Sequence, residues 1–230
     1  MKRRWTVGFD ADDTLWQNEK FFRMTQDRFA ELLGEHAAPE DLHQRLVAAE
    51  RRNLALYGFG IKGFVLSMIE TAIEVTDARV PARTIAQLID AGQDMLAHPI
   101  DLLPNAREAV EALSGKADVI LITKGDLLDQ ERKLAQSGLG ELFDAVEIVS
   151  DKTPAVYSRI FARHDTARAM MVGNSLKSDV LPALEVGAWG THVPHDLTWD
   201  YEHAEPPVDN PKFHRIADLG ALPGLIEQIG

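Results

Sequence analysis

Residues 117–123, ADVILIT, form an almost continuous apolar run instead of alternating apolar and polar side chains. This pattern is typical of a strand that is buried on both faces, as strands are in a parallel sheet. Helical patterns flank the run at 104–114 and at 126–137, and Gly138 marks the end of the second one. We therefore expect this part of the chain to be built from βαβ units.

The same alternation continues toward the C-terminus and has a counterpart near the start of the chain. Residues 5–9, WTVGF, form a short apolar strand pattern. We expect strands at 145–150, 169–174 and 190–194, helices at 154–163, 178–187 and 218–229, and a proline-rich loop at 195–212. Alternating strands and helices predict an α/β fold, a doubly wound parallel sheet with helices on both faces.

A long segment between the first strand and the rest of the sheet lacks strand patterns. Apolar residues recur at helical spacing over most of 20–97, and 62–77 is strongly apolar. We therefore predict two domains, an α/β core made of 1–16 and 100–230 and an inserted α-helical domain at 17–99. The apolar helix at 62–77 could be buried in the inserted domain or could pack against a second chain in a homodimer.

Composition narrows the function. The 230 residues include 24 Lys and Arg against 36 Asp and Glu, a net charge of −12, and no cysteine. The absence of cysteine excludes disulfides and thiolate chemistry, and the acidic balance argues against a nucleic-acid partner. The start, MKRRWTVGFDADD, has no apolar run long enough for a signal peptide or a membrane span. We expect a cytoplasmic protein without a membrane partner.

Polar side chains follow the predicted strands in four loops, 10–16, 123–126, 150–153 and 173–179. Ligands of doubly wound sheets bind at the carboxyl ends of the strands, so we expect these loops to meet. The first loop carries Asp10, Asp12, Asp13 and Thr14, and the second carries Thr123 and Lys124. The third carries Asp151 and Lys152, and the fourth carries Asn174, Ser175, Ser178 and Asp179. Gathered carboxylates need a cation, and oxygen ligands suit Mg²⁺. A carboxylate, a metal, a lysine and a hydroxyl together are the groups used in phosphoryl transfer.

These loops resemble a known family. The segments FDADDTLW (9–16), LITKGD (121–126), SDKTPAVYSRI (150–160) and VGNSLKSDV (172–180) are similar, in order, to the four motifs of the haloacid-dehalogenase-like (HAD) superfamily of hydrolases. The resemblance covers about residues 5–194. It implies a Rossmann-like core, and the insert resembles the helical cap of one large branch of the superfamily.

The resemblance also implies roles. Asp10 would attack phosphorus and form an aspartyl-phosphate, and Asp12 would protonate the leaving oxygen and then activate water. Thr123 and Lys152 would bind the phosphoryl group. Mg²⁺ would be held by Asp10, the main-chain carbonyl of Asp12, Asn174 and Asp179. The implied enzyme is a Mg²⁺-dependent phosphatase for a small phosphorylated metabolite.

One position departs from the family pattern. Residue 174 is Asn where such phosphatases usually have Asp, so we expect weaker metal affinity, and either Asn174 or Asp179 could be the direct ligand. Three alternatives stay open: a metal-independent 2-haloacid dehalogenase that uses Asp10, a phosphonatase or phosphomutase relative, and a non-catalytic binding protein. Asp12 argues against the dehalogenase, because a halide needs no protonation.

Other residues near these motifs have simpler interpretations. We expect Asp13 to be solvated in a loop or to cap a turn, Trp16 to pack, and Lys124 to be solvated. The segment GFGIKGF (58–64) is either a tight turn between helices or a specificity loop that brings Lys62 to the substrate. The physiological substrate and the oligomeric state are not encoded in a recognisable pattern.

Overall fold

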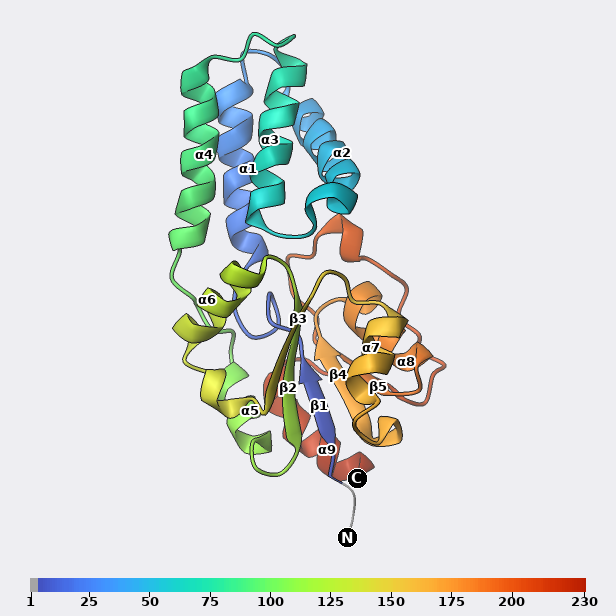
Figure 1. Cartoon of the computed structure of the whole chain (residues 1–230). Coiled ribbons are helices and arrows are strands. Elements are labelled where there is room, and N and C mark those ends of the chain that lie inside the picture. The colour runs from blue at the N-terminus through green and yellow to red at the C-terminus, as the bar shows by residue number, and fades with distance from the viewer. Residues whose placement is uncertain (1–3) are drawn as a thin grey trace. The chain divides into compact units, whose positions relative to one another are not determined.

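A computed structural model of the chain describes residues 4–230 (Figure 1). The strands are β1 (Thr6–Phe9), β2 (Asp118–Lys124), β3 (Ala145–Val149), β4 (Ala169–Gly173), β5 (Trp189–His192) and β6 (Phe213–Arg215). The helices are α1 (Glu19–Leu33), α2 (Pro39–Tyr57), α3 (Ile61–Val75), α4 (Ala82–Ala97), α5 (Ala106–Leu113), α6 (Leu127–Ser137), α7 (Pro154–Phe161), α8 (Leu181–Glu185) and α9 (Leu222–Ile229).

All strand pairs in the described sheet are parallel, in the order β3-β2-β1-β4-β5-β6. The first strand lies in the middle, where Val7 is in register with Val119 on one side and Met170 on the other. After β1 the chain adds β2 and β3 on one side of it, and then crosses over to add β4, β5 and β6 on the other side. The connections therefore diverge between β1 and β4. This confirms the predicted doubly wound parallel sheet, and ligands of such sheets bind beside that divergence.

Helices cover both faces of the sheet. One face packs Phe9, Leu121 and Val172 against α5 and α9, which contribute Val110 and Leu222. On the opposite face, β2 and β4 pack against α7 and α8 through a second apolar cluster that includes Ile122, Met171, Tyr157, Phe161 and Ala183. Burial of both faces explains why the central strands are continuously apolar in sequence.

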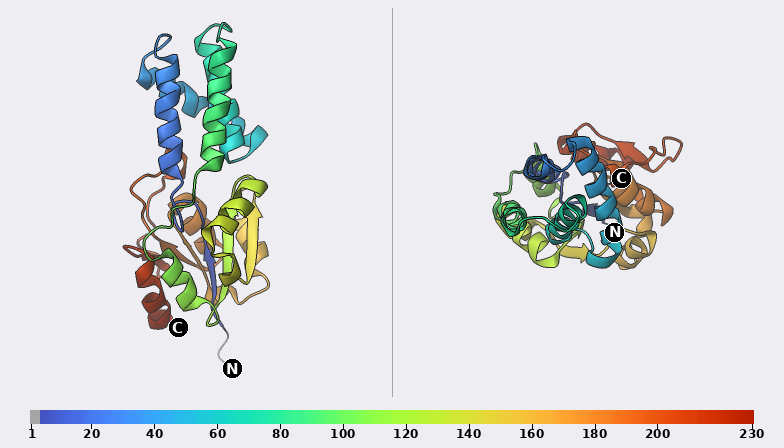
Figure 2. Two further views of the ribbon diagram at one scale, coloured as in Figure 1. Left: turned by 90° about the vertical axis from the view of Figure 1, so that its left-hand side faces the viewer. Right: turned by 90° about the horizontal axis from the view of Figure 1, so that it is seen from above.

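The helices α1 to α4 form a separate bundle with its own core. Buried side chains from all four helices meet there, among them Phe29, Leu46, Met68 and Leu88. Figure 2 shows α1 and α4 running alongside each other, and an exposed ion pair of 3.1 Å joins Arg28 to Asp94 across them. An all-helical insert was predicted for this part of the chain.

The described chain divides into two compact units. One holds the chain up to Glu19 together with Ile100–Lys124 and Gln130–Gly230, and the other holds Lys20–Pro99 with Gly125–Asp129. We call the first the sheet unit and the second the helical unit. No helix in residues 4–230 is long and apolar enough to cross a membrane.

Two elements differ from the sequence prediction. The predicted 195–212 loop contains a short 3-10 turn, Asp200–Glu202. The loop leads into an edge strand, β6, that the sequence analysis did not predict. The predicted helix at 178–187 is a π-helical turn, Leu176–Val180, followed by the short α8. Three-residue strands carry too little periodicity to be recognised in sequence.

Candidate active site

The site lies at the carboxyl end of the sheet, where β1 and β4 are adjacent. Asp10 follows β1 directly, and its main-chain N–H donates to the carbonyl of Val172 on β4. Asn174 follows β4. The predicted meeting of the loops is confirmed within the sheet unit. Side chains of the first, third and fourth loops are in hydrogen-bond contact, and Lys124 of the second loop donates to Ser178 of the fourth.

One lysine is shared by two buried carboxylates. Lys152 donates through Nζ to Asp10 Oδ1 and, at 2.6 Å, to Asp179 Oδ1. Asp10 is 6% exposed and Asp179 is fully buried. Burial, and then the nearby charge of Asp179, raise the pKa of Asp10 to about 7, although Lys152 opposes this shift. Burial alone would lower the pKa of Lys152, but the two carboxylates raise it above its usual range.

The other oxygen of Asp10 belongs to a second group of polar atoms. Thr14 Oγ1 donates to Asp10 Oδ2 at 3.0 Å and accepts from the main-chain N–H of Asn174, also at 3.0 Å. One terminal atom of the Asn174 amide lies 3.1 Å from Asp10 Oδ2 and 3.3 Å from the main-chain carbonyl of Asp12. With its nitrogen there, the amide donates to both oxygens. With its oxygen there, three oxygens face one another.

Three facing oxygens of this kind fit a hard cation. Carboxylate, carbonyl and amide oxygens are the ligands that Mg²⁺ prefers, and water and a phosphate oxygen usually complete its shell. Within residues 4–230, no group of three His, Asp or Glu side chains forms a metal site by itself. A Mg²⁺ ion would therefore depend on the Asp12 carbonyl and the Asn174 amide as well as on Asp10.

Each carboxylate oxygen of Asp179 has a protein donor, and the role of this residue as a metal ligand stays a prediction. Its Oδ1 accepts from Lys152, and its Oδ2 accepts from the main-chain N–H of Ser175 at 2.9 Å. The carboxylate also packs against the backbone of Gly173, where a Cβ atom would lie 2.2 Å from Oδ2. Asp179 is therefore arranged to hold Lys152 and the loop after β4.

The carboxylate of Asp12 is held by three donors. Trp16 Nε1 donates to it at 2.7 Å, Gln130 Nε2 at 2.8 Å, and Lys133 Nζ at 3.0 and 3.1 Å. Gln130 and Lys133 are three residues apart on α6, so they lie on one face of that helix. The motif analysis missed both. Their spacing just after the second motif was the available signal.

Three further residues singled out in the sequence are buried in the sheet unit. Thr123 ends the buried part of β2, 1% exposed, and no side-chain hydrogen bond to it occurs among the described residues. Asp13 is 7% exposed, which fits the capping alternative and not the solvated one. It accepts from the main-chain N–H groups of Asn18 and Glu19 at the start of α1, and burial raises its pKa to about 6. Trp16 is fully buried, as expected.

The expectation for Lys124 is wrong. Its side chain is 15% exposed and ion-pairs with Glu202, and it also donates to Ser178 Oγ at 2.8 Å. Glu202 comes from the predicted loop at 195–212, so no local pattern pointed to this pair.

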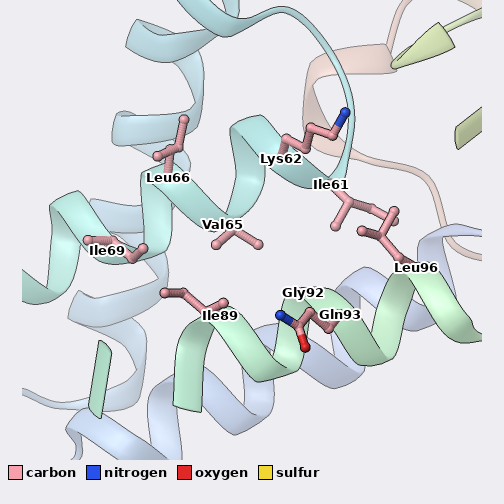
Figure 3. Close-up of a pocket in the computed structure, with 9 residues that line it drawn as sticks. All are labelled: Ile61, Lys62, Val65, Leu66, Ile69, Ile89, Gly92, Gln93 and Leu96. Carbon is pink, nitrogen blue, oxygen red and sulfur yellow. The ribbon is translucent and has the colours of Figure 1, made fainter. Parts of the chain in front are cut away.

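Lys62 lies in the helical unit, at one end of an apolar groove between α3 and α4 (Figure 3). Apolar side chains such as Val65, Ile69 and Ile89 line this groove. Lys62 Nζ forms a 2.8 Å ion pair with Asp126, and its side chain is 60% exposed. The structure therefore gives Lys62 a protein partner, and its contact with substrate stays a prediction.

Comparison with known proteins gives a consistent result. The profile of the haloacid dehalogenase-like hydrolases matches residues 6–187. A haloacid dehalogenase-like family hydrolase from Xanthomonas campestris is 41% identical, with a TM-score of 0.88 over 99% of this chain and 92% of that one. No curated protein matches the chain.

More distant structures share the fold. YfnB from Bacillus subtilis, solved with magnesium bound, is 16% identical with a TM-score of 0.68 over 98% of this chain and 99% of that one. L-2-haloacid dehalogenase from Xanthobacter autotrophicus, with chloropropionic acid covalently bound, is 18% identical with a TM-score of 0.66 over 99% of this chain and all of that one.

Proposed function

The chain belongs to the haloacid dehalogenase-like hydrolases, and we propose that within this family it is a Mg²⁺-dependent phosphatase for a small phosphorylated metabolite. The observation that carries the proposal is the set of groups that contact the two carboxylate oxygens of Asp10. Lys152 holds one oxygen of its carboxylate, and the other oxygen faces the Asp12 carbonyl and the Asn174 amide. Such a site offers a nucleophile, a cation for the phosphoryl charge and a set of Mg²⁺ ligands.

The proposed reaction has two displacements at phosphorus. An oxygen of Asp10 forms a bond to phosphorus while the bond to the leaving oxygen breaks, and Asp12 gives that oxygen its proton. Water then attacks the aspartyl-phosphate, Asp12 takes a proton from it, and the bond between Asp10 and phosphorus breaks to release phosphate. Lys152 and the hydroxyl of Thr123 bind phosphoryl oxygens in both steps.

Mg²⁺ bound by Asp10, the Asp12 carbonyl and Asn174 would supply positive charge that offsets the repulsion between the carboxylate and an anionic substrate. Asp179 would act through Lys152 and the loop after β4, because both of its oxygens accept hydrogen bonds from those groups. The one negative charge lost with Asn174 predicts modest metal affinity.

A metal-free haloacid dehalogenase is the second candidate, and two observations favour it. The Asn174 amide can satisfy Asp10 without a metal, by donating to Asp10 Oδ2 and the Asp12 carbonyl. Donors also occupy both carboxylate oxygens of Asp12, which a reaction with a halide leaving group tolerates because it needs no proton from that residue.

One experiment separates the two candidates. Hydrolysis of an aryl phosphate is compared for wild type and Asp10→Asn, each with Mg²⁺ and with chelator, beside release of halide from a 2-haloacid. The phosphatase predicts phosphate release that needs both Asp10 and Mg²⁺. Halide release that needs Asp10 and persists in chelator, without phosphate release, would contradict it.

The partner and location follow as proposals. The net charge of −12 supports a protein that has no nucleic-acid partner. The cytoplasmic location stays a prediction. Leu66 and Ile73 on α3 and Ile89 on α4 are each more than two-fifths exposed, which supports a homodimer through this face of the helical unit. Light scattering of wild type and Leu66→Lys tests the homodimer, because a lysine there should yield a monomer.

A further inference from the structure

A buried carboxylate outside the four sequence motifs lies beside the candidate active site. Glu202 ends the 3-10 turn Asp200–Glu202 in the connection between β5 and β6, and it is 8% exposed. Its Oε2 accepts from the hydroxyls of Ser175 and Ser178, each at 2.5 Å. Its Oε1 accepts from Lys124 Nζ. One carboxylate therefore joins the loop after β4 to the end of β2.

Each serine hydroxyl beside Glu202 accepts one hydrogen bond and donates another to the carboxylate. Ser175 Oγ accepts from the main-chain N–H of Ser178 at 2.9 Å, and Ser178 Oγ accepts from Lys124 Nζ at 2.8 Å. Each hydroxyl can then give its own proton to Glu202. Burial would raise the pKa of Glu202, but Lys124 and the two hydroxyls hold it below its usual range. A buried carboxylate is tolerated only when it is paired and hydrogen-bonded in this way.

Each group that Glu202 holds is adjacent in sequence to a proposed site residue. Lys124 follows Thr123, Ser175 follows Asn174, and Ser178 precedes Asp179. The main-chain N–H of Ser175 also donates to Asp179 Oδ2 at 2.9 Å. Movement of the serine loop would therefore shift Asn174 and Asp179 together.

A second contact fastens the same turn to the same loop. Lys177 Nζ donates to the main-chain carbonyl of Tyr201 at 2.9 Å and lies 3.4 Å from the centroid of its ring. The turn is therefore attached to the loop after β4 at two residues. Glu202 accepts hydrogen bonds from Ser175 and Ser178, and Tyr201 makes a hydrogen bond and a cation–π contact with Lys177.

We propose that Glu202 is a positioning residue for this active site, which fixes Lys124 and the loop from Ser175 to Ser178 so that Thr123, Asn174 and Asp179 keep their places. The inference rests on the proposed phosphatase function. Glu202 itself does not contact the reacting groups. Loss of its charge weakens the hydrogen bonds that hold Lys124, Ser175 and Ser178 in place. Displacement of site residues by about 1 Å can slow catalysis by about 10²-fold.

The test is the variant Glu202→Gln, with Glu205→Gln as the matched control. Glu205 lies in the same connection and is exposed, so the control removes one charge without touching the network. The kcat and KM for an aryl phosphate are measured in Mg²⁺, alongside the melting temperature of each variant. We expect Glu202→Gln to lower kcat roughly 10- to 100-fold with KM within about twofold of the control.

One further variant separates positioning from general stability. Ser175→Ala removes one donor to Glu202 and the acceptor of the Ser178 main-chain N–H, while the Lys124–Glu202 pair stays. We expect a smaller loss of kcat, also with KM nearly unchanged. It serves as the decisive variant if Glu202→Gln does not fold.

The outcomes distinguish this inference from the function on which it rests. Folded Glu202→Gln and Ser175→Ala proteins with the kcat and KM of the Glu205→Gln control would overturn the positioning role alone. A wild-type enzyme without Asp10-dependent turnover in Mg²⁺ would overturn the proposed function, and this inference with it.

Discussion

At the scale of single residues, the buried carboxylates at the site outnumber the cations that pair with them. Lys152 serves two carboxylates, Asp10 and Asp179, in a place with little access to solvent. Burial therefore raises the pKa of Asp10 to about 7. The Asn174 amide is the second element of this balance, because it can offer Asp10 either a donor nitrogen or a ligand oxygen.

The raised pKa predicts a pH-dependent stability difference for Asp10→Asn. The folded protein holds the proton of Asp10 more tightly than the unfolded chain, so the stability linked to that proton is lost as pH rises from about 4 through 7. Measured in chelator, the melting temperature of Asp10→Asn relative to wild type should therefore be several degrees higher at pH 8 than at pH 5. The exposed Asp209→Asn is the control, and a difference that stays constant with pH would refute the prediction.

Asn174→Asp should change stability in opposite directions with and without metal. In chelator the new carboxylate faces Asp10 Oδ2 and the Asp12 carbonyl, and the Thr14 hydroxyl, 3.3 Å away, already donates to Asp10, so the melting temperature should fall. A tenfold tighter Mg²⁺ site adds about 1.4 kcal/mol at saturating Mg²⁺, so the Mg²⁺-induced rise should exceed that of wild type by about 3–6 °C. Asn210→Asp, in the connection before β6, is the control. Equal Mg²⁺-induced shifts in Asn174→Asp and wild type would exclude Asn174 as the ligand.

At the scale of elements, the end of β4 and the turn that follows it place most of the site. The strand ends at Gly173, and the π-helical turn Leu176–Val180 brings Asp179 back against the strand end. Tyr157 on α7 supports this turn by donating to the main-chain carbonyl of Ser178 at 3.0 Å. On the other side of β1, α6 supplies the residues that hold Asp12.

Gly173 is predicted to be intolerant of even one methyl group. A Cβ atom there would lie 2.2 Å from Asp179 Oδ2 and 2.4 Å from its Cγ, so Asp179 must move. We expect Gly173→Ala to cost about 1–3 kcal/mol and to lower the melting temperature by several degrees. Gly224→Ala is the control, since no atom lies within 4 Å of a Cβ atom there, and it should be neutral or stabilising. A Gly173→Ala protein as stable as that control would contradict the close contact.

At the scale of the whole molecule, the described chain has two sets of buried apolar residues that belong to different units. The bundle core around Met68 shares no residue with the clusters on the two faces of the sheet. Each unit can therefore lose stability through its own core.

Hydrogen exchange should separate the two units. Met68→Ala removes a fully buried side chain from the bundle, at a cost of about 2–5 kcal/mol, so protected amides of α1 to α4 should exchange about 30-fold faster or more. Amides of β1, β2 and β4 should change much less. Met171→Ala, in the sheet unit, should give the reciprocal pattern. Equal acceleration in both units from either variant would mean that the chain opens as one cooperative body.

The sequence alone determined the elements and the order of the site loops. Long apolar runs and helical periodicity are local signals, so the strands through β5 and the helical insert could be predicted, and the parallel topology then required their carboxyl ends to meet. Tertiary structure alone decided the contacts made by Glu202, Lys133 and the edge strand β6. Glu202 lies 78 positions from Lys124 in the sequence, and Lys133 lies 121 positions from Asp12. The strand β6 has only three residues, so none of these features leaves a local pattern in the sequence. It also decided that Lys152 is shared and that Asn174 faces Asp10, because burial and charge balance arise only when distant segments pack together.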